Sequence, residues 1–139
     1  AICGRLPRFG ARGRVADHSS EEVLVIAVVW QFDVREGRQQ EFERFYGAGG
    51  PWTALSRRSR SFLGSSFLKA LAQPDRYIVI EYWSEMVVYE RHFADFADEI
   101  EQLERERATI VETMVPLGLF NALDVPDRFG PTWSQRSGH

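Results

Sequence analysis

Residues 76–89 predict a β-strand that leads directly into an α-helix. Residues 77–83 are β-branched or aromatic except for Glu81, and such side chains favour a half-buried strand. Because side chains alternate along a strand, Glu81 shares one face with Trp83, and bulky apolar groups occupy both faces. Ser84 has a side chain suited to cap the following helix. We therefore expect a strand buried on both faces and a helix that begins at Ser84.

After Ser84, apolar residues recur at steps of three and four, the spacing of one face of an α-helix. The members of this stripe are Met86, Tyr89, Phe93, Phe96, Ile100 and Leu103. We expect the helix to continue to about Arg107 and to pack on the sheet. If the Trp83 face of the strand is the one that faces the helix, Glu81, Trp83 and Tyr89 meet between sheet and helix.

The other segments complete a β-α-β-β-α-β order. Further strands are predicted at residues 23–34, 61–70 and 117–123. Helices are predicted after Gly37 and from Pro51, and the capping-box spacing of residues 109–112 predicts a short helix before the last strand. This order is the ferredoxin-like arrangement, an α+β fold with one antiparallel sheet.

The length of 139 residues suits a single domain, which we place at residues 22–123. Residues 1–21 lack an apolar period, and residues 124–139 are rich in Pro, Gly and Ser. Both segments are therefore predicted to be tails outside the domain.

The predicted sheet has helices on only one face, yet its first and third strands carry apolar side chains on both. A bare apolar face of this size needs a partner, and a second copy related by a two-fold axis supplies one. We expect a homodimer that forms through the sheet faces.

Charge and composition exclude several classes of protein. A net charge of -3 gives no electrostatic basis for binding nucleic acid or an anionic membrane. The longest apolar run is too short to span a bilayer. Cys3 is the single cysteine, so no internal disulfide is possible, and we expect a cytoplasmic protein. No set of His, Cys or carboxylate residues has metal-ligand spacing, so no metal site is expected.

Two short motifs resemble a known family. Gly-Pro-Trp precedes the second predicted strand, and Trp83-Ser84-Glu85-(x3)-Tyr89 follows the third. With the element order, they resemble the antibiotic biosynthesis monooxygenase family over residues 22–123. The resemblance implies a dimeric α+β barrel. Some members oxidise polycyclic phenols to quinones with O2 and no cofactor, some degrade heme, and many have no known substrate.

The resemblance also suggests positions for site residues. Quinone-forming members use an Asn, a Trp and a Tyr around this junction, and Trp83 and Tyr89 match the last two, whereas Val79 stands at the Asn position. Heme-degrading members use an Asn, a Trp and a His where this chain has Trp30, His92 and Gln102. None of these three matches, which disfavours heme degradation.

Glu81 and His92 are the candidate proton acceptors. A carboxylate in a mostly apolar cavity has a raised pKa and can act as a base toward a phenol. The alternative for Glu81 is an ion pair with Arg57 or Arg76 at the cavity rim. An imidazole at the pocket edge can transfer protons near neutral pH, and the alternative for His92 is a partly exposed helix residue.

The aromatic residues are the candidates for holding a substrate. Trp83 and Tyr89 are suited to stack on and orient an aromatic compound, although large aromatics at such positions more often serve packing. The residues expected to line or fill the cavity around them are Trp30, Trp52, Val79 and Phe93.

Two functions remain open from the sequence. The first is a cofactor-independent monooxygenase that oxidises a small aromatic or phenolic compound with O2. The second is a non-catalytic dimer that binds a small apolar ligand, which Val79 in place of the family's Asn favours. An open pocket with a polar group suits the enzyme, whereas a pocket plugged by Trp30 and Trp52 suits the second function.

Overall fold

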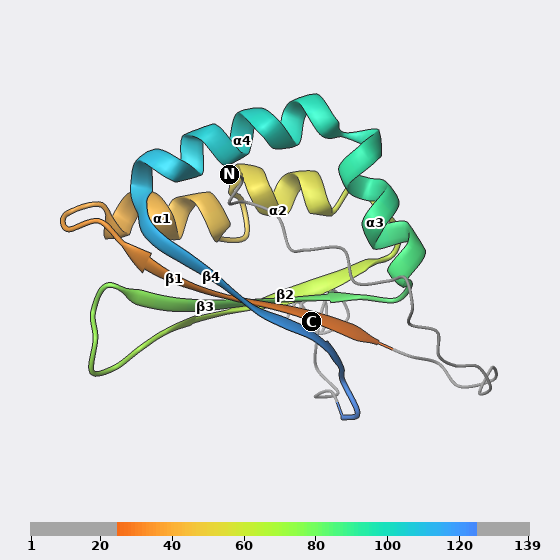
Figure 1. The fold of residues 1–139 in the computed structure, drawn as a ribbon, viewed down its shortest axis with the longest axis horizontal. Coiled ribbons are helices and arrows are strands. Elements are labelled where there is room, and N and C mark those ends of the chain that lie inside the picture. Colours follow the sequence, from red (N-terminus) through yellow and green to blue (C-terminus); the bar gives the residue numbers. More distant parts are fainter. Residues whose placement is uncertain (1–24, 125–139) are drawn as a thin grey trace, which may run out of the picture.

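The computed structural model describes residues 25–124, which form one antiparallel sheet with helices on one face (Figure 1). The predicted tails lie outside these residues, apart from Asp124. The elements are β1 (Ile26–Val34), α1 (Gln39–Tyr46), α2 (Pro51–Ser56), β2 (Phe62–Lys69), β3 (Arg76–Trp83), α3 (Met86–Asp95), α4 (Ala97–Ile110) and β4 (Val111–Asn121). The predicted α+β class and β-α-β-β-α-β order are confirmed.

The four strands lie in the order β2-β3-β1-β4, and each neighbouring pair is antiparallel. Both central strands place alternate side chains toward the helices, as predicted. The residues of this buried row are Val28, Trp30 and Phe32 in β1, and Tyr77, Val79, Glu81 and Trp83 in β3. They pack with Phe42, Phe45, Trp52 and Ile100 of the helices to form the core. The Trp83 face of β3 is therefore the helix-facing one.

The opposite side of the sheet carries no helix from residues 25–124 (Figure 1). Cross-strand partners share a face, so the pairs Leu68–Ile78, Ser66–Ile80, Gln31–Val115 and Ala27–Phe120 all lie on this side. Its apolar members, Val29, Leu68, Ile78, Ile80, Tyr82, Val115 and Phe120, are called the open face below. Leu68 is 49% exposed and Phe120 is 51% exposed. Among the described residues, the expected apolar surface on this side of the sheet is present.

The long helix predicted from Ser84 to Arg107 is instead two helices. Phe96 lies between α3 and α4 with φ -116° and ψ 36°, outside the helical region. Figure 1 shows α4 running along the sheet while α3 turns away toward the end of β3. The Phe96 ring lies 5.1 Å from the His92 ring, and the Arg58 guanidinium lies over it at 4.6 Å. The apolar stripe still faces the core on both helices.

The short helix predicted at residues 109–112 is wrong, because β4 already begins at Val111. Thr109 does not cap a helix there, since its hydroxyl donates to the Glu106 carbonyl in the last turn of α4 at 2.8 Å. The strand predicted at residues 117–123 starts after Pro116, whereas β4 contains this proline. It is accommodated because β4 is an edge strand and its register with β1 shifts at this point.

The predicted Ser84 cap is also wrong. The N-cap residue of α3 is Glu85, which makes no side-chain capping bond. The Glu85 backbone N–H donates to the Ser61 hydroxyl at 3.1 Å, and the Ser84 hydroxyl is itself paired with Ser61 at 3.1 Å. A residue that precedes β2 therefore supplies the polar partner that we expected from within the junction.

Asp33 and Arg76 form a two-bond ion pair across β1 and β3, at 2.9 and 3.2 Å, and the Thr113 hydroxyl donates to the same carboxylate at 3.0 Å. The bond from Arg76 holds the pKa of Asp33 below its usual 3.8. A depressed pKa adds stability above the usual value, and that stability disappears as pH falls through the depressed one. Asp33→Asn should therefore lose less stability than the wild type on acidification below about pH 4. Urea unfolding at a series of pH values measures this, and parallel pH profiles for the two proteins would contradict it.

Across residues 25–124, none of the helices is both long and apolar enough to cross a membrane. No cluster of three His, Cys, Asp or Glu residues in the same range could hold a metal ion.

Candidate functional site

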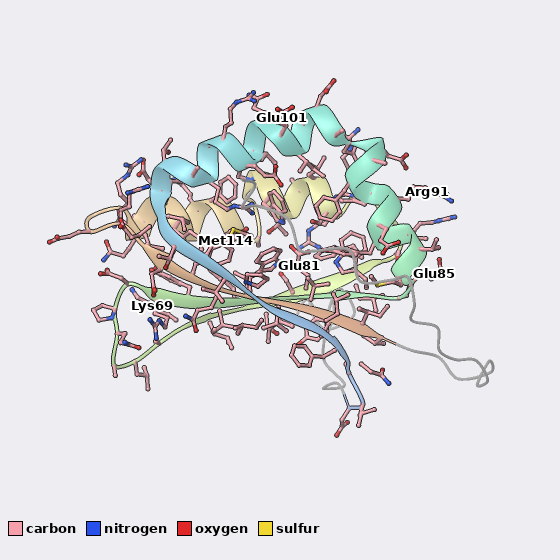
Figure 2. All side chains as sticks on the ribbon, viewed as in Figure 1. Lys69, Glu81, Glu85, Arg91, Glu101 and Met114 are labelled. Carbon is pink, nitrogen blue, oxygen red and sulfur yellow. The ribbon has the colours of Figure 1, made fainter. Side chains whose placement is uncertain are left out.

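Glu81 lies in the layer between the sheet and the helices (Figure 2). It occupies the middle of β3, opposite Val28 in β1 and Ser65 in β2, and is 6% exposed. Its two carboxylate oxygens accept bonds from two indoles, Trp52 Nε1 at 2.8 Å and Trp83 Nε1 at 3.2 Å. A buried carboxylate is costly without such donors, so α2 and β3 together make this position possible.

The ion pair that we considered for Glu81 is wrong. Arg76 bonds to Asp33 at the other end of β3, and the Arg57 guanidinium lies over the Phe62 ring at 5.9 Å. The positive charge that acts on Glu81 is that of Arg107. Burial raises the pKa of Glu81 above its usual 4.5, although both indole bonds and the Arg107 charge act in the opposite direction.

Arg107 is a site residue that the sequence analysis missed. It is 3% exposed, and its guanidinium lies 4.6 Å from the Trp52 ring centre. Its Nη1 donates to the Tyr46 hydroxyl at 2.6 Å. Burial raises the pKa of Tyr46 to about 12, so this phenol stays neutral at physiological pH. The sequence holds a signal for Arg107, since it stands four residues after Leu103 and continues the apolar stripe with a charged residue.

The strand–helix junction brings Trp83 and Tyr89 together, as predicted. Trp83 is fully buried, and its ring meets the Tyr89 ring edge-on at 5.2 Å. The Phe93 ring continues the contact, 5.1 Å from the Tyr89 ring. With Glu81 bonded to Trp83, the three residues expected to meet between sheet and helix do so.

His92 is buried at 5% exposure, so the prediction of a partly exposed helix residue is wrong. The rings of Phe93 and Phe96 meet its imidazole edge-on at 5.7 and 5.1 Å, and Trp83 lies at 5.2 Å. Its Nδ1 is buried and forms no hydrogen bond with the described part of the chain. Burial lowers the pKa of His92 below its usual 6.5, so the imidazole is neutral at pH 7.

Trp30, Trp52 and Val79 belong to the packed core, at 7%, 7% and 2% exposure. Two of the hollows that described residues line lie away from Glu81. One, of about 490 Å³, lies at the end of the sheet near Asp33, and the other, of about 330 Å³, lies beside Phe45. Neither is lined by Glu81 or by the indoles that bond to it.

No family model matches the sequence, and no curated protein matches it. Solved structures, by contrast, match the fold of this chain. A candidate antibiotic biosynthesis monooxygenase from Bordetella bronchiseptica is 18% identical, with 74% of this chain and 99% of that chain covered and a TM-score of 0.57. A second candidate of this kind, from Nitrosomonas europaea, is 12% identical over 73% of this chain and 93% of that chain, with a TM-score of 0.60. SnoaB, a cofactor-independent oxygenase from Streptomyces nogalater, is 18% identical over 75% and 98% of the two chains, with a TM-score of 0.54.

The chain has the fold of the antibiotic biosynthesis monooxygenases. The resemblance drawn from the two motifs is thus confirmed for the fold. Within this fold, the chain places Glu81 at the N–H of the Trp52 indole and Arg107 over the ring of the same indole. This layer has few polar groups among many aromatic rings, and its carboxylate can act as a proton acceptor.

The position of Trp52 depends on Gly50, the residue immediately before α2. A Cβ atom at Gly50 would collide with the backbone oxygens of Arg44 and Phe45. Gly50→Ala should therefore push α2 away from α1 and lower the free energy of unfolding by about 1–3 kcal/mol. Gly49→Ala is the matched control, because a Cβ there meets nothing within 4 Å. Denaturant unfolding of both variants measures the difference, and equal stabilities would contradict the expected collision.

Proposed function

We propose that this protein is a cofactor-independent monooxygenase that oxidises a small aromatic or phenolic compound with O2. The observation that carries the proposal is Glu81, a carboxylate with a raised pKa held by indole N–H groups inside an aromatic layer. A base with a raised pKa is better matched to an acidic C–H or phenol at neutral pH than an ordinary carboxylate. The solved structures with this fold include a cofactor-independent oxygenase, SnoaB, which supports the same reading.

In the proposed reaction Glu81 takes a proton from an activated methylene or phenol of the substrate. The resulting anion gives one electron to O2, and the radical pair recombines to form a carbon–oxygen bond. The peroxide receives the proton back from Glu81. Loss of water then breaks the O–O bond and leaves a carbonyl, so that a methylene and O2 become a carbonyl and one water. The substrate is the reductant, and no further electron donor is needed.

The other residues have proposed roles around this step. Trp83 and Tyr89 stack on the substrate and orient it, and Phe93 extends their edge-on row. His92 is neutral, its Nδ1 forms no hydrogen bond with residues 25–124, and it is the second proton acceptor. Trp30, Trp52 and Val79 surround the substrate. The Trp52 indole must turn away from Glu81 to admit it, because its N–H occupies one carboxylate oxygen.

Oxygen consumption with a panel of anthrones and hydroquinones tests the proposal. We expect at least one anthrone to be converted to the corresponding ketone, with one O2 consumed per product and no added cofactor. Glu81→Gln serves as the control for uncatalysed autoxidation. If no compound is turned over faster than in the Glu81→Gln control, while circular dichroism shows an intact fold, the enzyme proposal fails.

A second candidate function is a non-catalytic dimer that binds a small apolar ligand. The observation that favours it is the close packing of Trp30 and Trp52, each 7% exposed, within the core. Under this reading, aromatic compounds raise the melting temperature without consuming oxygen. Thermal shift and oxygen uptake with the same panel therefore separate the two functions.

We also propose that two copies associate through the open face and that the protein works in the cytoplasm. The exposed apolar members of the open face support the first statement, since isolated chains seldom leave a sheet face of this character in water. The single cysteine, Cys3, is compatible with a reducing compartment.

A further inference from the structure

Arg107 is a buried cation with no role in the reaction proposed above. It comes from the last turn of α4, where only 3% of its surface is exposed. Burying a guanidinium is costly unless its charge is balanced and its donors are bonded. Its Nη1 donates to Tyr46, and its charge acts on both Tyr46 and Glu81. The buried layer therefore holds one cation close to the candidate base.

Trp52 connects this cation to the base. Its ring centre lies 4.6 Å from the Arg107 guanidinium carbon, within the range of a cation–π contact. Its Nε1 donates to Glu81 at 2.8 Å. Arg107 also lies 5.9 Å from the Phe32 ring centre, so aromatic rings rather than water surround it. The indole that must move to admit a substrate is thus held by Glu81 at its N–H and by Arg107 at its ring face.

We propose that Arg107 is a positioning residue that holds Trp52 against Glu81 and balances the negative charge as it passes from Glu81 to the substrate. The charge-balancing half rests on the proposed function. Before proton transfer the Arg107 charge acts on anionic Glu81, and after transfer it acts on the substrate anion. In both states a cation stands close to the negative charge in a layer of low dielectric, where an isolated charge is costly.

The small aromatic or phenolic compounds proposed above are neutral when they enter, and the Arg107 charge favours the anion that forms when one proton is lost. The Arg107 charge disfavours aromatic amines that carry a positive charge, because they add a second cation beside Arg107. Tyr46 does not cancel the Arg107 charge, because the phenol stays neutral at physiological pH.

The charged and titratable groups around Glu81 come from three helices. Arg107 and Glu104 lie on α4, Tyr46 lies on α1, and His92 of α3 touches the Trp83 ring. The neighbours of Glu81 across the sheet, Val28 and Ser65, do not titrate. A titration is therefore assigned to Glu81 only where the signal comes from a group that is bonded to this carboxylate and where it disappears when the carboxylate is removed.

The indole N–H groups of Trp52 and Trp83 are such groups, because both bond to Glu81. In ¹H–¹⁵N spectra of the full chain, the two assigned indole resonances should shift together with one midpoint above 4.5, the usual pKa of a glutamate, because burial raises the pKa of Glu81. Glu81→Gln should abolish this shared transition. Arg107→Met removes the positive charge and should raise the midpoint, because the Arg107 charge lowers the pKa of Glu81. Arg107→Lys keeps the charge and should stay closer to the wild type.

An unchanged midpoint in folded Arg107→Met overturns the proposal, as does an equal shift in the lysine variant. A wild type without a shared transition also overturns it, because Glu81 then exchanges no proton in the working range. If Arg107→Met does not fold, Tyr46→Phe removes the hydroxyl that holds Arg107. That variant should raise the midpoint by a smaller amount, and no change there contradicts the proposal.

The titration needs no turnover. If the indole midpoints respond as expected but no compound is oxidised, the proposed enzyme function fails while the coupling of Arg107 to Glu81 stands. If oxidation occurs but the midpoint is the same in Arg107→Met as in the wild type, the proposed reaction stands and the positioning role of Arg107 fails.

Discussion

Replacing Glu81 with glutamine is expected to lower kcat for an oxidised anthrone by about 10²–10⁴-fold, the usual contribution of a general base. Glutamine keeps the size of the side chain and can still accept an indole N–H bond, but it cannot take a proton. Initial rates of oxygen uptake measure the loss. Glu112→Gln is the matched control, because Glu112 is an exposed carboxylate on β4 whose side chain retains 62% exposure. A Glu81→Gln variant with the wild-type rate would remove Glu81 from the mechanism.

The same variant has a distinct pH signature in stability. The pKa of Glu81 is raised in the folded chain above the usual 4.5. The folded state then binds more protons than the unfolded state between the two values, so this group costs stability as pH rises through that window. Glu81→Gln lacks the cost. The difference in unfolding free energy between variant and wild type should therefore move in favour of the variant from pH 4.5 upward.

Replacing Ile80 with glutamate is expected to convert a dimer into a monomer. Ile80 lies on β3, a central strand, and its side chain belongs to the open face, between Val29 of β1 and Ser66 of β2. In a two-fold interface through this face, each copy contributes one glutamate, so a single substitution introduces two carboxylates. Burying an unpaired charge costs several kcal/mol for each ion, which exceeds what most interfaces can absorb.

Sedimentation at low micromolar concentration measures this effect. The wild type should sediment as a dimer and Ile80→Glu as a folded monomer. Val87→Glu is the control, because Val87 is equally aliphatic but lies on α3 at 60% exposure. A wild type that sediments as a folded monomer would contradict association through the open face, as would a dimeric Ile80→Glu.

Strands and their faces were predictable because alternation is a local property. The period of two along β3 places Glu81 with Trp83, and burial of that face decides which way both point. The break at Phe96 was not predictable in the same way, because the apolar stripe continues through it without a change of spacing. Pro116 misled the prediction of β4, since the cost of a proline depends on whether its strand lies at the edge of the sheet.

The site was half predictable for a similar reason. The contact between Trp83 and Tyr89 was predictable because the two residues lie only six positions apart, across a strand–helix junction. Trp52 and Arg107 approach Glu81 from 29 residues before it and 26 after it, so only the packed structure brings the three together. The residue type indicates that a buried Glu81 needs hydrogen-bond donors. It does not indicate that these donors are the indoles of Trp52 and Trp83 rather than Arg76, which lies only five positions away in the sequence.

The strand order β2-β3-β1-β4 has a consequence for how the chain is made. The first strand to leave the ribosome, β1, is an inner strand whose two neighbours are completed only at Trp83 and Asn121. At about 5–20 residues per second, the 49 residues from Val34 to Trp83 take roughly 2–10 s to emerge. During that interval β1 exposes both hydrogen-bonding edges and a run of Ile, Val and Trp side chains. Nascent chains of this protein should therefore depend on a holding chaperone until β3 has emerged.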